Sequence, residues 1–351
     1  MKTRERAKAL SSVTEFSFED LIGLVNKEFG NPNSLDEFVE YGDIFVKAKP
    51  VSPILHILAG NTPEAAIQSL TRGLLIGAYN QVKLPKQGIK DFDNFIKNLP
   101  SELISLVETT SNRKVADDWI NSASAVIAFG SDETLMQIAE KIHPSQIFIP
   151  HNHKISLAVI DSDENLDAAQ LAAIDIYSHD QRGCLSPHDI YVCPKIKPRS
   201  FASRLANELN LLNKKKPPEK RTTEESAAID HLRRSYEFRA CNDTSVQIWK
   251  SENNLDWTVV YEDEIQFAQS PLGQFVFVKP LPKDLTKAVS IIGESISTIA
   301  LHPFKLERAE SLILAGGNRV CPLGTSQKPS TYWHHDGYQS LAPLVRWVNA
   351  G

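Results

Sequence analysis

Short apolar runs alternate with amphipathic segments along the first half of the chain. Three runs of strand length lie between polar or glycine-containing turns, at residues 54–58, 81–84 and 125–129. After Thr62-Pro63, a favourable helix start, apolar side chains recur at helical spacing at Ile67, Leu70, Leu74 and Ala78. The pattern therefore predicts a strand, a helix with one apolar face, and then a second strand.

The same alternation continues along the rest of the chain. Further helices are predicted over 101–109, 132–142, 165–178, 199–212 and 223–240. Further strands are predicted over 146–149, 155–160, 189–193, 246–250, 257–262, 275–279 and 298–302. Strands that alternate with helices are typical of an α/β fold, in which helices cover both faces of a parallel sheet.

One segment interrupts the alternation. Residues 213–225 concentrate lysine, arginine and proline between two predicted helices. A solvated connecting loop is the simpler interpretation, and a basic clamp for a phosphorylated ligand is the alternative. The chain has 351 residues, more than the roughly 250–300 at which a single core stops growing, so we expect two domains.

Composition and charge narrow the class of protein. The chain is 42% hydrophobic and 23% charged with a net charge of −5, and no basic tail or helix indicates nucleic-acid binding. No run reaches the roughly 18 apolar residues of a membrane span. The basic N-terminus lacks the apolar core of a signal peptide, and the four cysteines form no CxxC motif. We therefore expect a cytoplasmic protein whose cysteines are reduced.

The strongest candidate for chemistry is Cys184, in the segment 178–187 between a predicted helix and a predicted strand. Gly183 permits a tight turn or a close approach to a ligand. Positive charge from Arg182 and His179 would favour the thiolate, which is the nucleophilic form of cysteine. The alternative is a buried, inert thiol. The other three cysteines lack such neighbours and are predicted to be structural.

Two strand-to-helix junctions carry further candidates. Asn61 precedes a predicted helix, where its amide could donate to a developing oxyanion or could simply form a turn. Gly130 and Ser131 follow a predicted strand, and small residues there permit close approach of a cofactor. Ordinary N-capping by Ser131 explains the second junction equally well.

Histidines cluster in two pairs, His151 with His153 and His334 with His335. Such pairs can assemble a metal site, but neither has the i, i+4 spacing of a metalloprotease helix. We therefore predict no metal, and a structural or substrate-contacting role for these side chains.

Taken in order, these segments resemble the aldehyde dehydrogenase superfamily, and within it the LuxC-type acyl-CoA reductases that supply aldehyde in bacterial luminescence. The resemblance runs from about residue 50 onwards and rests on Gly60-Asn61-Thr62-Pro63, Gly77 to Pro85, Phe129-Gly130-Ser131, Asp180-Gln181-Arg182-Gly183-Cys184, Trp333 to Gly337 and Leu344 to Trp347. The Asp-Gln-x-Gly-Cys-Leu-Ser-Pro form of the cysteine segment is typical of the LuxC-type branch. The order and spacing of the segments carry the resemblance together.

This resemblance implies an aldehyde-dehydrogenase-like α/β fold with two lobes, each a mostly parallel sheet flanked by helices. A nicotinamide-cofactor-binding lobe is expected at residues 1–150. A catalytic lobe carrying Cys184 is expected at residues 151–325. The C-terminal segment 326–351 is expected to return to the first lobe or to form an interface.

The resemblance also implies roles for individual residues. Cys184 is expected to be the nucleophile, and Asn61 with the backbone N–H of Cys184 is expected to form the oxyanion hole. Lys83 is expected to contact the adenosine ribose or its phosphate. Gly130 and Ser131 are expected to contact the cofactor. Proton transfer to the leaving thiol is left open among three histidines: His179, His334 and His335.

Departures from the superfamily pattern indicate which reaction of the superfamily to expect. Hydrolytic members carry Glu-Leu-Gly-Gly-Lys before the second lobe, where this chain has Pro150-His151-Asn152-His153-Lys154. The glutamate that activates water is absent, which fits an acyl group that passes to or from coenzyme A. The Lys83 segment is shorter than usual, so Lys86 is a substitute candidate. Because 60 residues precede Asn61, part of the cofactor lobe or of the oligomerisation arm is expected to be reduced.

The sequence thus predicts an acyl-CoA reductase that converts an acyl thioester to an aldehyde through a covalent acyl-Cys184 intermediate. NADPH is the expected cofactor, and the sequence does not exclude NADH. A cysteine-dependent acyltransferase or hydrolase without nicotinamide is one alternative, and a non-catalytic partner subunit on the same fold is another. The expected partner is acyl-CoA or another acyl thioester, with a homo-oligomer or an acyl-transferring protein left open.

Overall fold

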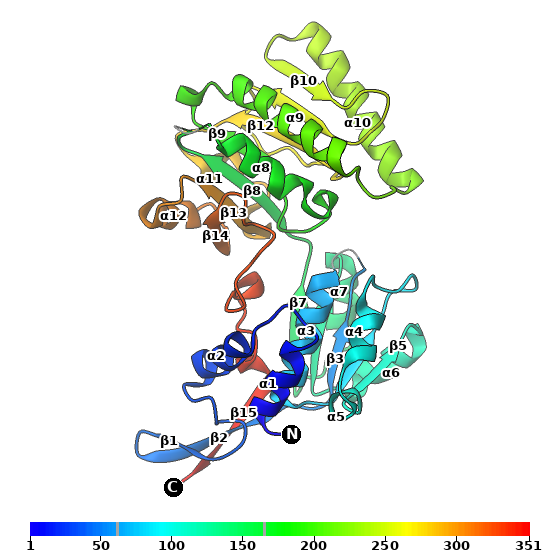
Figure 1. Ribbon diagram of the computed structural model, residues 1–351, viewed down its shortest axis with the longest axis vertical. Coiled ribbons are helices and arrows are strands. Elements are labelled where there is room, and N and C mark those ends of the chain that lie inside the picture. The colour runs from blue at the N-terminus through cyan, green and yellow to red at the C-terminus, as the bar shows by residue number, and fades with distance from the viewer. Residues whose placement is uncertain (61–62, 164–165) are drawn as a thin grey trace. The chain divides into compact units, whose positions relative to one another are not determined.

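The computed structural model describes residues 1–60, 63–163 and 166–351, and the chain divides into two compact units (Figure 1). Unit 1 consists of residues 1–153 and 330–351, and unit 2 consists of residues 154–329. The lobe boundaries expected after residues 150 and 325 lie close to these divisions. The assignment of cofactor binding to one lobe and catalysis to the other stays a prediction.

Within the described residues, unit 1 is built on a five-stranded parallel sheet with strand order β5-β4-β3-β6-β7. Its strands are β3 (Ile54–Ile57), β4 (Asn80–Lys83), β5 (Val107–Thr110), β6 (Ala125–Phe129) and β7 (Ile147–His151). Its helices are α3 (Pro63–Ile76), α4 (Phe92–Asn98), α5 (Ser101–Ile104), α6 (Arg113–Ser122) and α7 (Asp132–Ala139).

The helix predicted over 101–109 is wrong in its second half. Helix α5 ends at Ile104, and Val107–Thr110 forms the edge strand β5 beside β4. The strand carries a valine and two threonines, β-branched residues that fit a pleated, half-buried surface better than a helix. Sheet pairing therefore overrides the helical spacing in this segment.

Alternate residues of the central strand β3 face two different helical layers. Ile54 packs with the apolar face of α3, whereas Leu55 packs with α6 and α7 on the opposite side. His56 lies under α3, where its ring nitrogens are 2.8 Å from Ser69 Oγ and 3.0 Å from Asn80 Oδ1. Burial lowers the pKa of His56 to about 4, so this histidine is neutral in the folded protein.

Helix α3 lies against the sheet at Gly73. A Cβ atom at this position would fall 1.9 Å from Asn80 Oδ1 on β4. Only glycine permits this close approach, and the same Asn80 oxygen bonds to His56. The polar contact between α3 and the sheet therefore depends on the absence of a side chain at Gly73.

A second, antiparallel sheet in unit 1 joins segments from the two ends of the chain. β2 (Ile44–Pro50) pairs with β1 (Val39–Tyr41) on one side and with β15 (Val345–Ala350) on the other. Helices α1 (Thr3–Ser11) and α2 (Phe18–Phe29) pack on the core under α3. The Glu28 carboxylate on α2 accepts the backbone N–H groups of three consecutive residues at 2.7–2.8 Å, namely Ser340, Leu341 and Ala342.

In the described part of unit 2, a seven-stranded sheet has the order β10-β11-β12-β9-β8-β13-β14. Neighbouring strands run parallel, except for the antiparallel pair β10 and β11. The strands are β8 (Ile155–Ile160), β9 (Pro187–Val192), β10 (Val246–Lys250), β11 (Thr258–Glu262), β12 (Phe275–Pro280), β13 (Ile296–His302) and β14 (Arg319–Pro322). The helices are α8 (Ala168–Tyr177), α9 (Pro198–Lys215), α10 (Thr223–Asn242), α11 (Leu285–Ala288) and α12 (Leu306–Ile313).

Helices cover both faces of the unit 2 sheet, as Figure 1 shows. Helices α8 and α9 pack on one face, where the buried alanines of α8 permit close contact. Helices α10, α11 and α12 pack on the other face. The prediction of an α/β fold with mostly parallel sheets flanked by helices is confirmed. No helix among the described residues is both long and apolar enough to cross a membrane.

Candidate active site

Cys184 lies in a short loop between α8 and β9, directly after the 3₁₀ turn η1 (Ser178–Gln181). Three consecutive residues of this turn have left-handed backbone conformations: His179 (φ 52°), Asp180 (φ 52°) and Gln181 (φ 61°). Non-glycine residues rarely adopt this region, at a cost of roughly 1–2 kcal/mol each. The surrounding hydrogen bonds must therefore hold the turn in this shape.

Buried side-chain hydrogen bonds fix the turn before Cys184. The Gln181 amide donates to the carbonyls of Pro187 and Phe275 at 2.9 and 3.0 Å and accepts the Phe275 N–H at 2.8 Å. The Asp180 carboxylate accepts the Glu219 backbone N–H at 2.9 Å and the Gln274 amide at 3.1 Å. Most of these partners of Asp180 and Gln181 lie far away along the chain, so the sequence alone does not predict the hydrogen bonds.

The thiol itself is partly accessible. Cys184 is half-buried in the turn after Gly183, and its carbonyl accepts the Ser156 hydroxyl of β8 at 2.6 Å. Of the other cysteines, Cys193 is half-buried, Cys241 is exposed and Cys321 is buried. Burial raises the pKa of Cys321 to about 11, which suits a structural thiol. The prediction that Cys184 is the nucleophile stays a prediction.

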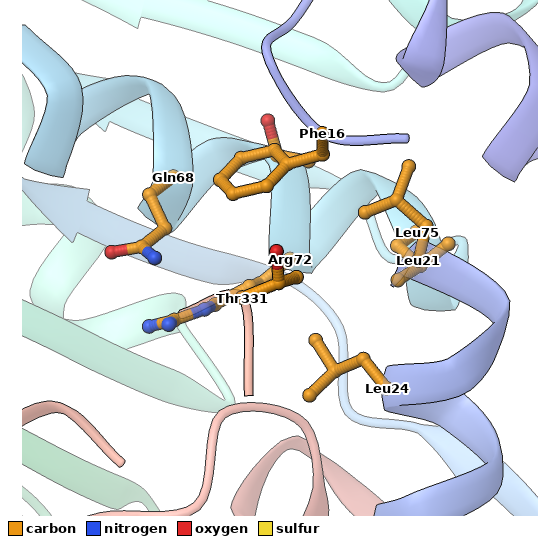
Figure 2. Close-up of a pocket in the computed structure, with 8 residues that line it drawn as sticks. Phe16, Leu21, Leu24, Gln68, Arg72, Leu75 and Thr331 are labelled. Carbon is orange, nitrogen blue, oxygen red and sulfur yellow. The ribbon is translucent and has the colours of Figure 1, made fainter. Parts of the chain in front are cut away.

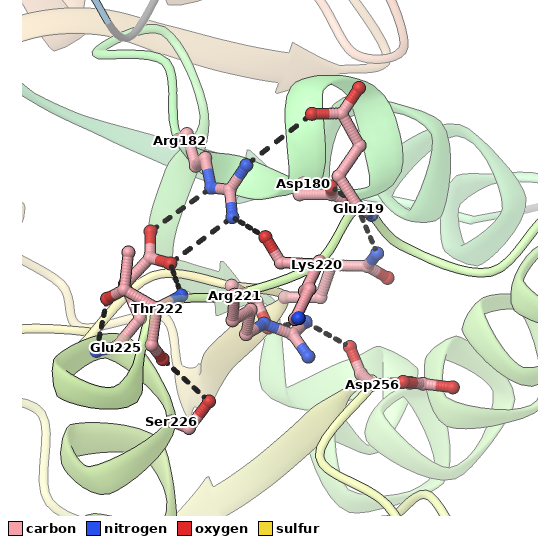
Figure 3. A network of polar contacts seen from close by, with 11 residues as sticks. Asp180, Arg182, Glu219, Lys220, Arg221, Thr222, Glu225, Ser226 and Asp256 are labelled. Carbon is pink, nitrogen blue, oxygen red and sulfur yellow. Dashed lines mark hydrogen bonds and ion pairs between the residues drawn. The ribbon is translucent and has the colours of Figure 1, made fainter. Parts of the chain in front are cut away.

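Arg182, predicted to favour the Cys184 thiolate, forms ion pairs with two glutamates. Figure 3 shows its guanidinium turned toward the loop between α9 and α10. It lies 3.2 Å from Glu225 Oε1 and 3.7 Å from Glu219 Oε2, and it also approaches the Lys220 carbonyl at 3.5 Å. The effect of Arg182 on the Cys184 thiol stays a prediction.

The basic segment predicted at 213–225 contains an exposed connection between two helices, as the simpler interpretation of a solvated loop expects. Its first part extends α9 to Lys215, and its last part starts α10 with a capping box of Thr222 and Glu225. Between them, the Arg221 guanidinium donates to the carbonyls of Asp256 and Gly273 at 2.9 Å. The segment is thus packed against the cysteine loop, as Figure 3 shows.

The three histidines considered for proton transfer fall into different units. His179 is exposed and lies in unit 2 with Cys184. His334 is exposed and His335 is buried, both in unit 1. Burial and the nearby His151 lower the pKa of His335 to about 3, which makes it a neutral ring at physiological pH.

One histidine of each pair found in the sequence contacts a histidine of the other pair in unit 1. The rings of His151 and His335 lie 4.3 Å apart, stacked between Phe129 and Trp333. His151 Nδ1 lies 2.7 Å from Asp336 Oδ2, and His335 Nε2 lies 3.7 Å from the same oxygen. These three side chains could converge on a metal ion. A metal site built from the two histidine pairs was weighed from the sequence, and the prediction was that there is no metal.

The residues predicted to contact a cofactor lie at the ends of two strands of unit 1, on either side of β3. Lys83 ends β4, and Gly130 and Ser131 follow β6, so they flank the carboxyl end of β3. The chain leaves β3 toward β4 and later returns to β6 on the other side, which makes this edge a topological switch point where ligands bind in open α/β sheets. Asn61, predicted for the oxyanion hole, lies outside the described residues.

Ser131 has a structural role in addition to any cofactor contact. Its hydroxyl caps α7 by accepting the Thr134 N–H at 3.3 Å. Gly130 leaves ordinary van der Waals space, since a Cβ there would meet Thr134 at 3.4 Å. Acidic Asp132 and Glu133 occupy the first turn of α7, which disfavours a phosphate at that helix end. The predicted cofactor contacts of Gly130 and Ser131 stay predictions.

Comparison with known proteins identifies the family. The acyl-CoA reductase family LuxC matches residues 2–347. The chain belongs to the LuxC family of acyl-CoA reductases. The prediction of an enzyme of the acyl-CoA reductase type is thereby confirmed.

Relatives of this LuxC family member are named as long-chain acyl-protein thioester reductases. The Aliivibrio fischeri protein is 24% identical over 94% of this chain and 70% of its own length. The Vibrio harveyi protein is 26% identical over the same shares of the two chains. Their printed names describe reduction of an acyl-protein thioester.

Solved structures similar to this LuxC family member are aldehyde dehydrogenases. A benzaldehyde dehydrogenase from Corynebacterium glutamicum, described as NAD-dependent, has a TM-score of 0.65 at 13% identity over 100% of this chain and 86% of its own. A glyceraldehyde-3-phosphate dehydrogenase from Methanocaldococcus jannaschii, solved with NADP, has a TM-score of 0.67 at 12% identity over 99% and 85%. The chain therefore has the aldehyde dehydrogenase fold, as its sequence predicted.

Proposed function

We propose that this protein reduces an acyl thioester to an aldehyde through a covalent acyl-Cys184 intermediate, with NADPH as the hydride donor. The observation that carries the proposal is the Cys184 loop. A half-buried thiol follows Gly183 on a left-handed turn that buried hydrogen bonds hold in place. Membership of the acyl-CoA reductase family and the names of the relatives support an acyl thioester as substrate.

The first half of the reaction transfers the acyl group to the enzyme. The Cys184 thiolate attacks the thioester carbonyl, the original carbon–sulfur bond breaks, and the leaving thiolate takes up a proton. Asn61 and the Cys184 N–H are the proposed donors to the oxyanion. Loss of one such donor typically costs about 3–4 kcal/mol of transition-state stabilisation.

The second half needs a reductant. Lys83, Gly130 and Ser131 lie at the switch point of the unit 1 sheet, and this placement fits a nicotinamide nucleotide. A nicotinamide bound there would supply the hydride that converts acyl-Cys184 to aldehyde and the Cys184 thiolate. The positive charge of Lys83 can serve a ribose 2′-phosphate, which supports NADPH over NADH.

The absent general base supports reduction over hydrolysis. Pro150-His151 occupies the place where hydrolytic relatives of this fold carry their glutamate. No carboxylate at this position is available to activate water against the acyl-enzyme. The acyl group is therefore expected to persist on Cys184 until it is reduced or returned to a thiol.

The test is NADPH oxidation, followed by absorbance, with acyl-CoA substrates of increasing chain length. We expect turnover for the wild type and for the control Cys193→Ala, which removes another half-buried thiol of unit 2. We expect none for Cys184→Ala. Mass spectrometry without NADPH should find an acyl adduct on the wild type and none on Cys184→Ala.

Other outcomes would replace the proposal. An adduct without oxidation of NADPH or NADH, at any chain length, would favour an acyltransferase or hydrolase. Neither adduct nor oxidation would favour a partner subunit that lacks activity of its own. Unchanged turnover in Cys184→Ala would exclude Cys184 as the nucleophile.

A further inference from the structure

Buried polar side chains that the proposed chemistry does not use occur in both units. In unit 1, Arg72 on α3 borders a small pocket beside Phe16 and Leu24 (Figure 2). This pocket has room for about one water molecule, so it is too small for a substrate. In unit 2, by contrast, the buried hydroxyl of Ser156 contacts the cysteine loop directly.

Ser156 lies near the start of β8, a central strand of the unit 2 sheet between β9 and β13. The residue is 1% exposed, so water cannot replace its partners. Its hydroxyl accepts the backbone N–H of Thr298 at 3.2 Å and donates to the Cys184 carbonyl at 2.6 Å. Because the hydroxyl has a single proton and the Thr298 N–H can only donate, that proton is committed to the Cys184 carbonyl.

The sheet is irregular on both sides of Ser156. Toward β9, the extra residue His188 lies between the partners of Ser156 and Leu157. Toward β13, the two residues Ser297 and Thr298 stand opposite Ser156 alone. Such β-bulges are frequent next to active sites, where they re-aim a side chain. Both irregularities therefore meet at the residue that holds the Cys184 carbonyl.

The peptide groups on both sides of the reacting residue are held by hydrogen bonds. The Gly183 carbonyl, which precedes Cys184, accepts the Ser186 N–H at 3.0 Å within the same short turn. The Cys184 carbonyl, which follows the thiol, accepts the Ser156 hydroxyl and is thereby tied to a central strand of the sheet. The thiol and the Cys184 N–H move with these peptide groups, so their orientation depends on both bonds.

We propose that Ser156 is a positioning residue for the reaction at Cys184, an inference that rests on the proposed function. Through the Cys184 carbonyl, Ser156 holds the thiol and the Cys184 N–H in the orientation that attack on the thioester requires. Without the hydroxyl, this carbonyl loses a donor and the peptide group can turn. Misplacement of a reacting group by about 1 Å can slow a reaction roughly 100-fold. The role needs no contact with the substrate, so Ser156 should affect the rate and not the affinity.

The test is single-turnover acylation of Cys184 in the full chain, followed by quenched flow over a range of acyl-CoA concentrations. Ser156→Ala should lower the maximal rate at least about tenfold and leave the concentration for half-maximal rate unchanged. Ser156→Thr keeps the hydroxyl on a β-branched side chain that suits a strand, and it should stay within about threefold of the wild type. The matched control Ser251→Ala removes another buried hydroxyl of unit 2, which donates to the Asn254 and Trp257 carbonyls, and it should acylate at the wild-type rate.

Alkylation of Cys184 by iodoacetamide separates positioning from loss of structure. Alkylation needs an accessible thiolate but no donor to an oxyanion, so Ser156→Ala should keep the wild-type dependence of the alkylation rate on pH. A purely structural role would change alkylation and lower the melting temperature together with the acylation rate. Peptide mapping must assign the adduct, because Cys193 is also half-buried and Cys241 is exposed.

A further variant keeps the test decisive if Ser156→Ala folds poorly. Ser156→Cys keeps the size of the side chain but offers only a weak donor, so it should acylate at Cys184 at least about threefold more slowly than Ser156→Thr. Equal rates in these two variants, or in the wild type and Ser156→Ala, would overturn the inference and leave the proposed function intact. A wild type that acquires no adduct on Cys184 would overturn the proposed function and this inference with it.

Discussion

At the scale of single residues, the notable feature is the turn that precedes Cys184. Three left-handed residues in succession carry no glycine, so local preference does not specify this backbone. Asp180 and Gln181 offset the conformational cost with buried hydrogen bonds to residues about 40 and 94 positions away in sequence. The position of the thiol thus depends on tertiary contacts rather than on its own segment.

This dependence gives a prediction for Asp180→Ala. The change leaves the Glu219 N–H without its acceptor, removes one of the two acceptors of the Gln274 amide and loosens the turn. We expect acylation of Cys184 in a single turnover to slow by about tenfold or more, since small misplacements of a reacting group are costly. Quenched-flow acylation with acyl-CoA measures the rate.

The control for this prediction is Asp230→Ala, which removes a partly exposed i,i+4 pair with Arg234 in the same unit. Such a pair contributes little to stability, so acylation should remain at the wild-type rate. If Asp180→Ala lowers the melting temperature and the folded fraction still acylates normally, Asp180 has only a structural role.

Candidate residues could be chosen from sequence where the signal is local, although their roles stay predictions. Gly183 and the polar residues before it marked Cys184 as the candidate thiol. The ion pair of Arg182 with Glu225 could not be predicted, because Glu225 comes from a different element. Arg72 drew no attention, since an arginine on an amphipathic helix is ordinary until folding brings it near His335. The contact of Asp336 with His151 could not be predicted either, because 185 positions separate the two residues.

At the scale of elements, strands covered on both faces of the large sheets were predicted, whereas among the described edge strands β7 and β10 were predicted and others were not. Strands β3, β6, β8 and β9 are covered on both faces, and their continuous apolar runs predicted them well. The edge strand β5 was predicted as helix, and the strands β14 and β15 were not predicted. Edge strands are partly exposed and carry mixed polar and apolar residues, so their sequence pattern is weak.

The close approach of α3 to β4 gives a prediction for Gly73→Ala. The added methyl group would meet Asn80 Oδ1 and disturb its bond to His56. We expect unit 1 to lose about 2–4 kcal/mol of stability, within the range for overpacking combined with a broken buried hydrogen bond. Urea denaturation followed by circular dichroism measures the change.

Gly130→Ala is the matched control for this substitution. A Cβ at Gly130 meets Thr134 only at ordinary contact distance, so stability should change little. Equal destabilisation by the two substitutions would show that the packing at Gly73 is not the cause.

At the scale of the whole molecule, the two units carry buried ionisable groups of opposite behaviour. In unit 1, burial lowers the pKa of His56 to about 4, below its ordinary 6.5. In unit 2, burial raises the pKa of Asp189 to about 8, far above its ordinary 3.8. Asp189 Oδ1 has no hydrogen-bond acceptor or donor among the described residues, which suits a protonated carboxyl that avoids a buried charge.

These shifts predict opposite responses to pH. The contribution of His56 is present above about pH 6.5 and is lost as the pH falls toward about 4, because the unfolded chain binds a proton first. The contribution of Asp189 is present at low pH and is lost as the pH rises through about 8. Through these two groups, acidification from about pH 7.5 to about pH 5 should therefore lower the free energy of unfolding of unit 1 and raise that of unit 2.

Amide hydrogen exchange, corrected for the intrinsic effect of pH, measures both units in one experiment. Asp189→Asn should flatten the response of unit 2 and leave that of unit 1 unchanged. If protection in both units changes in the same direction in wild type and variant, groups other than these two dominate.

The pairing of β2 with β15 has a consequence for the order of events during synthesis. The ribosome completes the whole of unit 2 before it delivers the strand that closes the small sheet of unit 1. Until then, the edge of β2 has no neighbouring strand on that side. The Glu28 carboxylate also lacks the three backbone N–H donors that it has in the finished protein. Unit 2 can fold on the nascent chain, whereas unit 1 remains incomplete. Its unpaired strand edge is then available for binding by chaperones.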